Sequence, residues 1–143
     1  MRSFKTLFIL LVLVAAGTAV WWWYQSAQPD SGPARQAGGP LVDVTVPAVL
    51  SATAQDGKIL FDRNCAECHG ENAAGSEKGP PLVHKIYEPS HHGDAAFYLA
   101  ARNGVRAHHW PFGDMPPRPE VSDPEMAAIV AYVREFQQAN GIR

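Results

Sequence analysis

The chain has 143 residues, a length that suits one ordinary domain with short accessory segments and is too small for two well-packed domains. The formal net charge is −2, and from Ser51 onward 9 Lys and Arg stand against 12 Asp and Glu, so the basic surplus typical of nucleic-acid binding is missing. The two cysteines stand three positions apart, and a disulfide between them would close too short a loop to stabilise a fold. They therefore indicate chemistry rather than cross-linking.

Residues 1–24 combine a short basic start with a long apolar run. From Thr6 to Tyr24 there is no charged side chain, and about 19 such residues nearly span the ~30 Å core of a bilayer. The four aromatic residues at positions 21–24 are typical of a membrane interface, and the basic start favours a cytoplasmic end. We expect an N-terminal transmembrane anchor. The alternative is a signal sequence cleaved near Gly17-Thr18-Ala19, which would leave a soluble periplasmic protein. Both place the rest of the chain on the periplasmic, exported side.

Residues 25–50 are rich in Pro, Gly and Ala, which is the composition of a flexible linker. We expect the small apolar island Leu41–Val46 to lie extended against the domain that follows. We assign that domain to residues 51–143.

The domain is predicted to be all-α, with three to four helices and long loops. The first helix runs from Thr53 to Asn64, with Thr53 or Ser51 as its N-cap. A second follows Gly93-Asp94 and ends at Asn103-Gly104, where glycine suits the left-handed position. The last begins at the capping box Ser122-Asp123-Pro124-Glu125 and carries an apolar stripe until Gly141. No segment alternates as a strand would.

Cys65-Ala66-Glu67-Cys68-His69 places two thiols and an imidazole within five residues. Haem attachment through two thioethers needs two thiols that reach the vinyl groups and an imidazole that ligates the iron from the same face, and this motif meets all three needs. A thioredoxin-like pair would need a βαβ surrounding, and a zinc site would need a second ligand pair; the sequence offers neither. We expect one haem c bound covalently through Cys65 and Cys68, with His69 as an iron ligand.

From about Ser51 to Asn140 the chain resembles the class I c-type cytochromes. In that family a helix bearing Gly and an aromatic residue precedes the haem motif and packs across a C-terminal helix with its own aromatic residue. Gly57, Phe61 and Tyr132 match that set. The resemblance implies a small cytochrome c fold around one haem.

The resemblance also implies two further site residues. Gly79-Pro80-Pro81-Leu82 matches a stretch in which the carbonyl of Pro80 would accept the proton of the free nitrogen of His69, fixing the ring. Met115, in a proline-flanked loop before the last helix, matches the sixth iron ligand. Met126 lies on the apolar stripe of the last helix, where a core role is expected.

The remaining histidines are alternatives for the sixth ligand or for a second metal site. Neighbouring side chains rarely aim at one atom, so we expect them to be solvated or hydrogen-bonded. These are His84, His91, His92, His108 and His109. Trp110-Pro111-Phe112 is expected to pack over the haem edge. Arg102 and Arg106 could meet a haem propionate or could be solvated.

His and Met ligation would fill both axial positions of the iron and raise its reduction potential. The sequence therefore predicts a carrier of single electrons between membrane or periplasmic redox partners, and not an enzyme. The alternatives are a haem protein that binds nitric oxide or carbon monoxide in place of Met115, or the electron-transfer subunit of a periplasmic dehydrogenase. The membrane would be contacted through the N-terminal segment, and no nucleic acid is expected.

Overall fold

The structure is a computed structural model that describes residues 16–24, 26 and 39–143. The chain divides into two compact units, residues 1–35 and 36–143. In the first unit residues 16–24 are helical, and among the described residues no helix has the length and apolar character needed to cross a membrane. Most of the predicted anchor falls on residues 1–15, which lie outside the described part. The anchor therefore stays a prediction.

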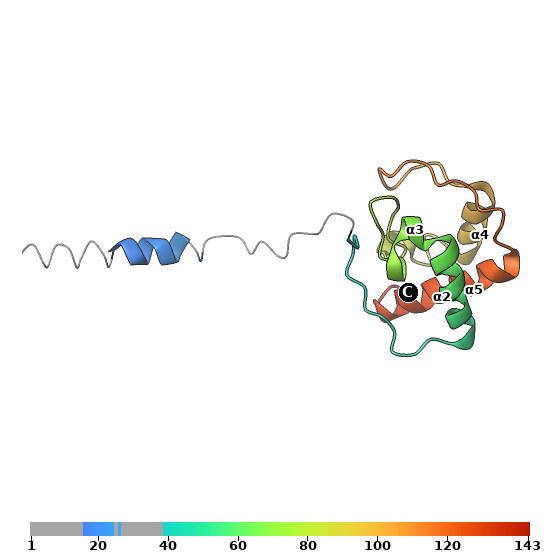
Figure 1. The fold of residues 1–143 in the computed structure, drawn as a ribbon, viewed down its shortest axis with the longest axis horizontal. Helices are drawn as coiled ribbons and strands as arrows, with labels where there is room; N and C mark the ends of the chain where they lie inside the picture. The colour runs from blue at the N-terminus through green and yellow to red at the C-terminus, as the bar shows by residue number, and fades with distance from the viewer. Residues whose placement is uncertain (1–15, 25, 27–38) are drawn as a thin grey trace, which may run out of the picture. The chain divides into compact units, whose positions relative to one another are not determined.

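The second unit is built from helices and loops (Figure 1). Its helices are α2 (Ala52–Asn64), α3 (Ala66–His69), α4 (Asp94–Asn103) and α5 (Asp123–Ala139), with 3-10 turns η1 (Glu71–Ala73) and η2 (Lys85–Tyr87). Strand pairing within residues 39–143 is limited to two isolated bridges, Ser76 with Gly79 and Val105 with Met115. The all-α prediction is confirmed, and α3 is a short helix that the sequence pattern did not indicate.

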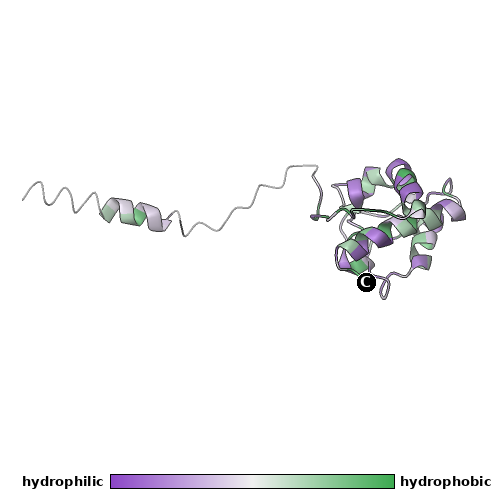
Figure 2. Ribbon diagram, turned by 90° about the horizontal axis from the view of Figure 1, so that it is seen from below, coloured by the Kyte–Doolittle hydropathy of each residue, from purple (hydrophilic) through white to green (hydrophobic). Residues whose placement is uncertain are grey.

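Helix α5 forms where the capping box predicted it. The Glu125 carboxylate accepts hydrogen bonds from the Ser122 N–H at 2.9 Å and from the Ser122 hydroxyl at 2.7 Å, and these bonds lower the pKa of Glu125. The apolar stripe is buried in the core of the domain, and Figure 2 shows apolar and hydrophilic residues side by side on the same helices. The buried stripe consists of Met126, Ile129, Val130, Val133 and Phe136.

Helix α2 packs on α5 and is capped by Ser51, whose hydroxyl accepts the Ala54 N–H. The rings of Phe61 and Tyr132 meet at the crossing with centroids 5.2 Å apart, and both side chains are fully buried. The expected packing of the two aromatic residues is confirmed. Burial raises the pKa of the Tyr132 phenol, whose oxygen has no hydrogen-bond partner in the described part of the chain.

The island Leu41–Val46 lies on the helical domain, as expected. The Leu41 N–H donates to the Ala74 carbonyl at 3.0 Å. Farther along, Thr45 and the Asn140 side chain exchange two hydrogen bonds of 2.8 and 2.9 Å. These contacts join the segment both to the loop after α3 and to the end of α5.

Candidate haem site

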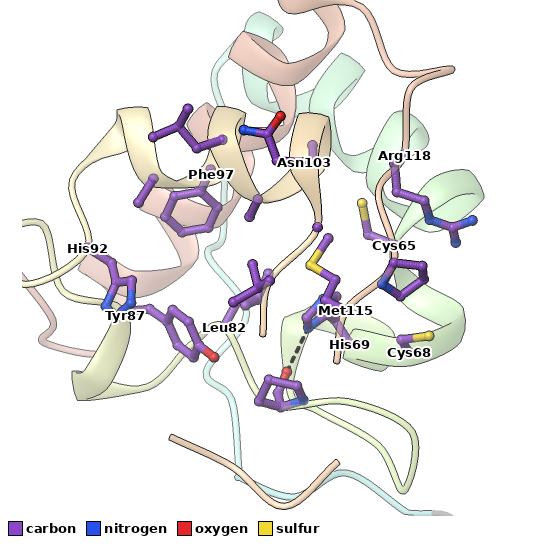
Figure 3. A pocket seen from close by; sticks show the side chains of 18 of the residues that line it. Cys65, Cys68, His69, Leu82, Tyr87, His92, Phe97, Asn103, Met115 and Arg118 are labelled. Atoms are coloured by element: carbon purple, nitrogen blue, oxygen red, sulfur yellow. Dashed lines mark hydrogen bonds between the residues drawn. The ribbon is translucent and has the colours of Figure 1, made fainter. Parts of the chain in front are cut away.

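The domain contains a cavity of about 430 Å³ between the helices and the long loops, a size within the ~300–1,000 Å³ typical of ligand sites. Apolar side chains make up most of its wall. Figure 3 shows Cys65 and Cys68 toward one side of the cavity, with Tyr87 and His92 toward the other. All five predicted site residues line it: Cys65, Cys68, His69, Pro80 and Met115.

Cys65 lies between α2 and α3, and Cys68 lies within α3. Cys65 ends α2 by donating its N–H to the Phe61 carbonyl at 2.8 Å, and its own carbonyl then accepts the His69 N–H at 2.9 Å. Both thiols are free. Burial raises the pKa of the Cys65 thiol to about 11, although the Arg118 guanidinium lowers it in part. The motif thus places both cysteines and one imidazole on the wall of a single cavity.

His69 is held in one tautomer by Pro80. Its Nδ1 lies 2.9 Å from the Pro80 carbonyl oxygen, which can only accept, so Nδ1 carries the proton and Nε2 keeps its lone pair. Burial lowers the pKa of His69, the bond to Pro80 opposes that shift, and Arg118 adds to it. The ring is therefore set up as a neutral nitrogen ligand.

Met115 is positioned by a two-residue bridge to Val105, with N–H to carbonyl bonds of 3.0 and 2.9 Å in both directions. The neighbouring Gly104 has φ +72°, and a Cβ there would lie 2.5 Å from the Met115 carbonyl oxygen. Met115 is half-buried in the cavity wall. Met126 also lines the cavity, but from α5 and as a member of the buried core.

The wall carries a polar atom that lacks a protein partner. Burial raises the pKa of the Tyr87 phenol, and the nearby Trp110 indole lowers it in part. The Trp110 N–H and the Tyr87 phenol nevertheless do not form a hydrogen bond. The Trp110 nitrogen is thus buried without an acceptor in the described part of the chain. Trp110 and Phe112 both line the cavity. A large apolar group with acceptor oxygens at its edge, such as haem, fits this wall.

The other predicted residues are distributed as follows. Arg102 forms an exposed ion pair with Asp123 at 2.8 Å, which agrees with the solvated alternative. The nitrogen Nδ1 of His84 accepts the Ile86 N–H at 3.2 Å, so His84 caps η2. Cavity residues that the sequence did not single out include Arg118, whose guanidinium donates to the Asn64 carbonyl at 2.9 Å. A cation directly after the two prolines that follow Met115 is a weak signal for that role.

The comparisons with known proteins agree with this geometry. Residues 54–137, more than half of the chain, match the model of the cytochrome c family, and the chain belongs to that family. A stretch of 39 residues is 56% identical to the Cbb3-type cytochrome c oxidase subunit CcoP of Azospirillum brasilense. That stretch covers 23% of this chain and 13% of the relative, so the likeness spans a small part of the longer protein.

Membership in the family defines the cofactor and the general role. The chain carries haem c, covalently bound through the paired cysteines Cys65 and Cys68. Electron transfer is the general activity of such a haem protein.

Proposed function

We propose that the domain is a carrier of single electrons in which His69 and Met115 would both ligate the haem iron. The observation that carries this proposal is that both side chains line one cavity with the two cysteines, while the His69 Nδ1 proton is already bound by Pro80. Bound haem supplies exchange of one electron between ferric and ferrous iron.

Each residue has a distinct part in this proposal. Pro80 holds the proton of His69, which keeps Nε2 unprotonated and orients the ring. Val105 holds the Met115 backbone on both its N–H and its carbonyl, so that the thioether is presented from a fixed point. With two protein ligands the iron would have no position left for a gas or a substrate, which favours electron transfer over enzymatic or gas-binding chemistry.

Met115 is preferred to Met126 as the sulfur ligand because of where each backbone lies. Met126 is fixed in α5, 6% exposed, and packs within the hydrophobic core. Met115 lies in a loop whose bridge to Val105 leaves the side chain on the cavity wall. Removing Met126 should therefore alter packing, whereas removing Met115 should alter the iron.

The optical spectrum of the oxidised protein tests this assignment. We expect a weak band toward the red end of the spectrum, which marks bonding of a methionine sulfur to ferric iron. Met115→Ala should abolish the band and Met126→Leu should retain it, since the latter is a volume-conserving core exchange. Persistence of the band in Met115→Ala would refute the assignment.

We further propose that residues 1–24 tether the domain to a membrane, with the haem domain on the exported side and redox proteins as its partners. Trp21, Trp22, Trp23 and Tyr24 are 61–73% exposed, an arrangement that suits the interface between lipid and water. The likeness to a subunit of a cytochrome c oxidase supports a partner that belongs to a membrane redox complex.

A further inference from the structure

Four histidine rings gather where two loops meet at the rim of the cavity. His91 and His92 follow η2, and His108 and His109 lie in the loop between α4 and Met115. The His109 ring centroid is 5.4 Å from that of His91 and 5.3 Å from that of His92. The two adjacent pairs, 17 residues apart in sequence, thus come together through the fold.

We propose that His91, His92 and His109 form a binding site for one divalent transition-metal ion of the zinc class. One ligating nitrogen from each ring lies within 4.8 Å of the others. Imidazole is a preferred ligand of Zn²⁺ and of its first-row neighbours, whereas Mg²⁺ and Ca²⁺ require oxygen ligands. The proposed site uses none of the residues assigned to the haem iron, although His92 and His109 also line the haem cavity.

His92 supplies the fixed part of this site. The ring is half-buried, and its Nδ1–H donates to the Ile86 carbonyl at 2.6 Å, which leaves the Nε2 lone pair available. A second bond holds the backbone, because the His92 carbonyl accepts from the Arg134 guanidinium at 2.5 Å. Orientation of a ligating imidazole by a carbonyl on its other nitrogen is the usual arrangement in metal sites.

Arg134 connects this fixed ring to the core of the domain. Its guanidinium also donates to the Tyr87 carbonyl at 2.8 Å and pairs with Asp94 at 2.8 Å, and it lies 4.9 Å from the centroid of the Phe97 ring. The loop that carries His91 and His92 is therefore attached to α5 through the Tyr87 and His92 carbonyls, and Arg134 in turn joins α5 to α4. Such a loop can hold a ligand in place.

His91 and His109 supply the adjustable part. Both are exposed, so their rings can turn without disturbing the core. Tetrahedral Zn²⁺ with Zn–N distances of 2.0–2.1 Å places its ligands roughly 3.4 Å apart. Rotation of the two exposed rings would have to bring the nitrogens, which lie within 4.8 Å of one another, to that separation. Three imidazoles would leave a fourth position for water, as in open zinc sites.

Metal binding at this site would cross-link the loop after η2 to the loop that ends at Met115. The second loop is closed by the Val105 bridge and by the Asp114 carboxylate, which accepts the Ala107 N–H at 2.8 Å. A ligand that binds the folded state raises its thermal stability. Metal binding at this site can therefore be detected in a second way, as a rise in the melting temperature of the protein.

Isothermal titration of the haem-loaded full chain in neutral detergent tests the proposal, with Zn²⁺ as the probe and Mg²⁺ as the comparison cation. We expect one Zn²⁺ per chain, no heat from Mg²⁺, and a rise in melting temperature with Zn²⁺. His91→Ala and His109→Ala should each weaken Zn²⁺ binding at least about tenfold, the lower bound for loss of a supporting group.

His108→Ala is the matched control, since it removes the ring adjacent to His109 but outside the three ligands. It should change the affinity less than about twofold, and an unaltered haem spectrum will show that each variant is folded. Absence of Zn²⁺ binding, or an equal loss in the His91, His108 and His109 variants, would overturn the proposal. Neither result would bear on the assignment of Met115 as an iron ligand, because that assignment is tested by the band at the red end of the spectrum.

Discussion

Gly57 on α2 lies directly against the backbone of Ala128 on α5: a Cβ at position 57 would stand 1.9 Å from the Ala128 carbonyl oxygen and 2.5 Å from its carbon. The two helices approach this closely because the glycine has no side chain. The close approach also lets Phe61 and Tyr132 meet beside the crossing.

Gly57→Ala should therefore strongly destabilise the domain. Overpacking against side chains typically costs about 1–3 kcal/mol, and a clash with backbone on a rigid helix should reach at least about 3 kcal/mol. Guanidinium denaturation of the haem-loaded protein measures it. Gly93→Ala is the control, because a Cβ there would lie 3.6 Å from its nearest neighbour, the Pro89 carbonyl oxygen, and the change should cost about 1 kcal/mol or less. Equal effects of the two changes would contradict the packing.

Gln137→Leu should destabilise the loop beside the cavity. The Gln137 side chain is 1% exposed, and its amide donates to the Leu82 carbonyl at 2.8 Å and to the Tyr87 carbonyl at 3.0 Å. Leucine keeps the approximate volume but leaves buried carbonyls without this donor, at a cost of about 1–3 kcal/mol in the free energy of unfolding. The neighbouring Gln138 is exposed, so Gln138→Leu should change stability by less than about 0.5 kcal/mol. Indistinguishable unfolding curves for the two variants would refute this role.

Gly104→Ala should displace Met115. Position 104 has φ +72°, which costs an alanine about 1–2 kcal/mol, and its Cβ would also meet the Met115 carbonyl at 2.5 Å. The band toward the red end of the oxidised spectrum should weaken. Gly113→Ala carries similar strain at φ +83° with nothing within 4 Å of its Cβ, so it should retain the band. If both variants keep full intensity, contact with Gly104 does not position Met115.

The proposed tether predicts that the native protein pellets with membranes and resists extraction by salt. Replacing residues 1–24 by a cleavable export signal should release a soluble haem protein whose spectrum is unchanged, because the helical unit holds the cavity on its own residues. Fractionation and N-terminal sequencing check it. A native protein found soluble, with its first residue near Val20, would show instead that Gly17-Thr18-Ala19 is a cleavage site.

Local sequence signals sufficed for the elements that frame the site. The capping box at Ser122 and the apolar stripe behind it predicted α5, and the spacing of Cys65, Cys68 and His69 predicted the haem attachment. The bond from His69 to Pro80 was expected through the family resemblance alone and is present at 2.9 Å.

Features that depend on contacts between distant loops were not accessible in this way. Adjacent histidines rarely direct both rings at one atom, so the sequence argued against a metal site, whereas the fold brings His91 and His92 next to His109. Gln137 occupies a position on the buried stripe of α5 where an apolar residue is expected. Its role as a hydrogen-bond donor depends on carbonyls about 50 residues away in sequence. Such partners have no fixed spacing in sequence.

Carbon monoxide binding to the reduced protein tests the proposed ligation of the iron by Met115 most directly. A filled sixth position should make the parent protein resist carbon monoxide, and Met115→Ala should bind it readily while His69 and both thioethers keep the haem in place. Met126→Leu should behave as the parent does. Carbon monoxide binding by the parent as fast as by Met115→Ala would contradict the assignment of Met115, and with it the electron-carrier proposal.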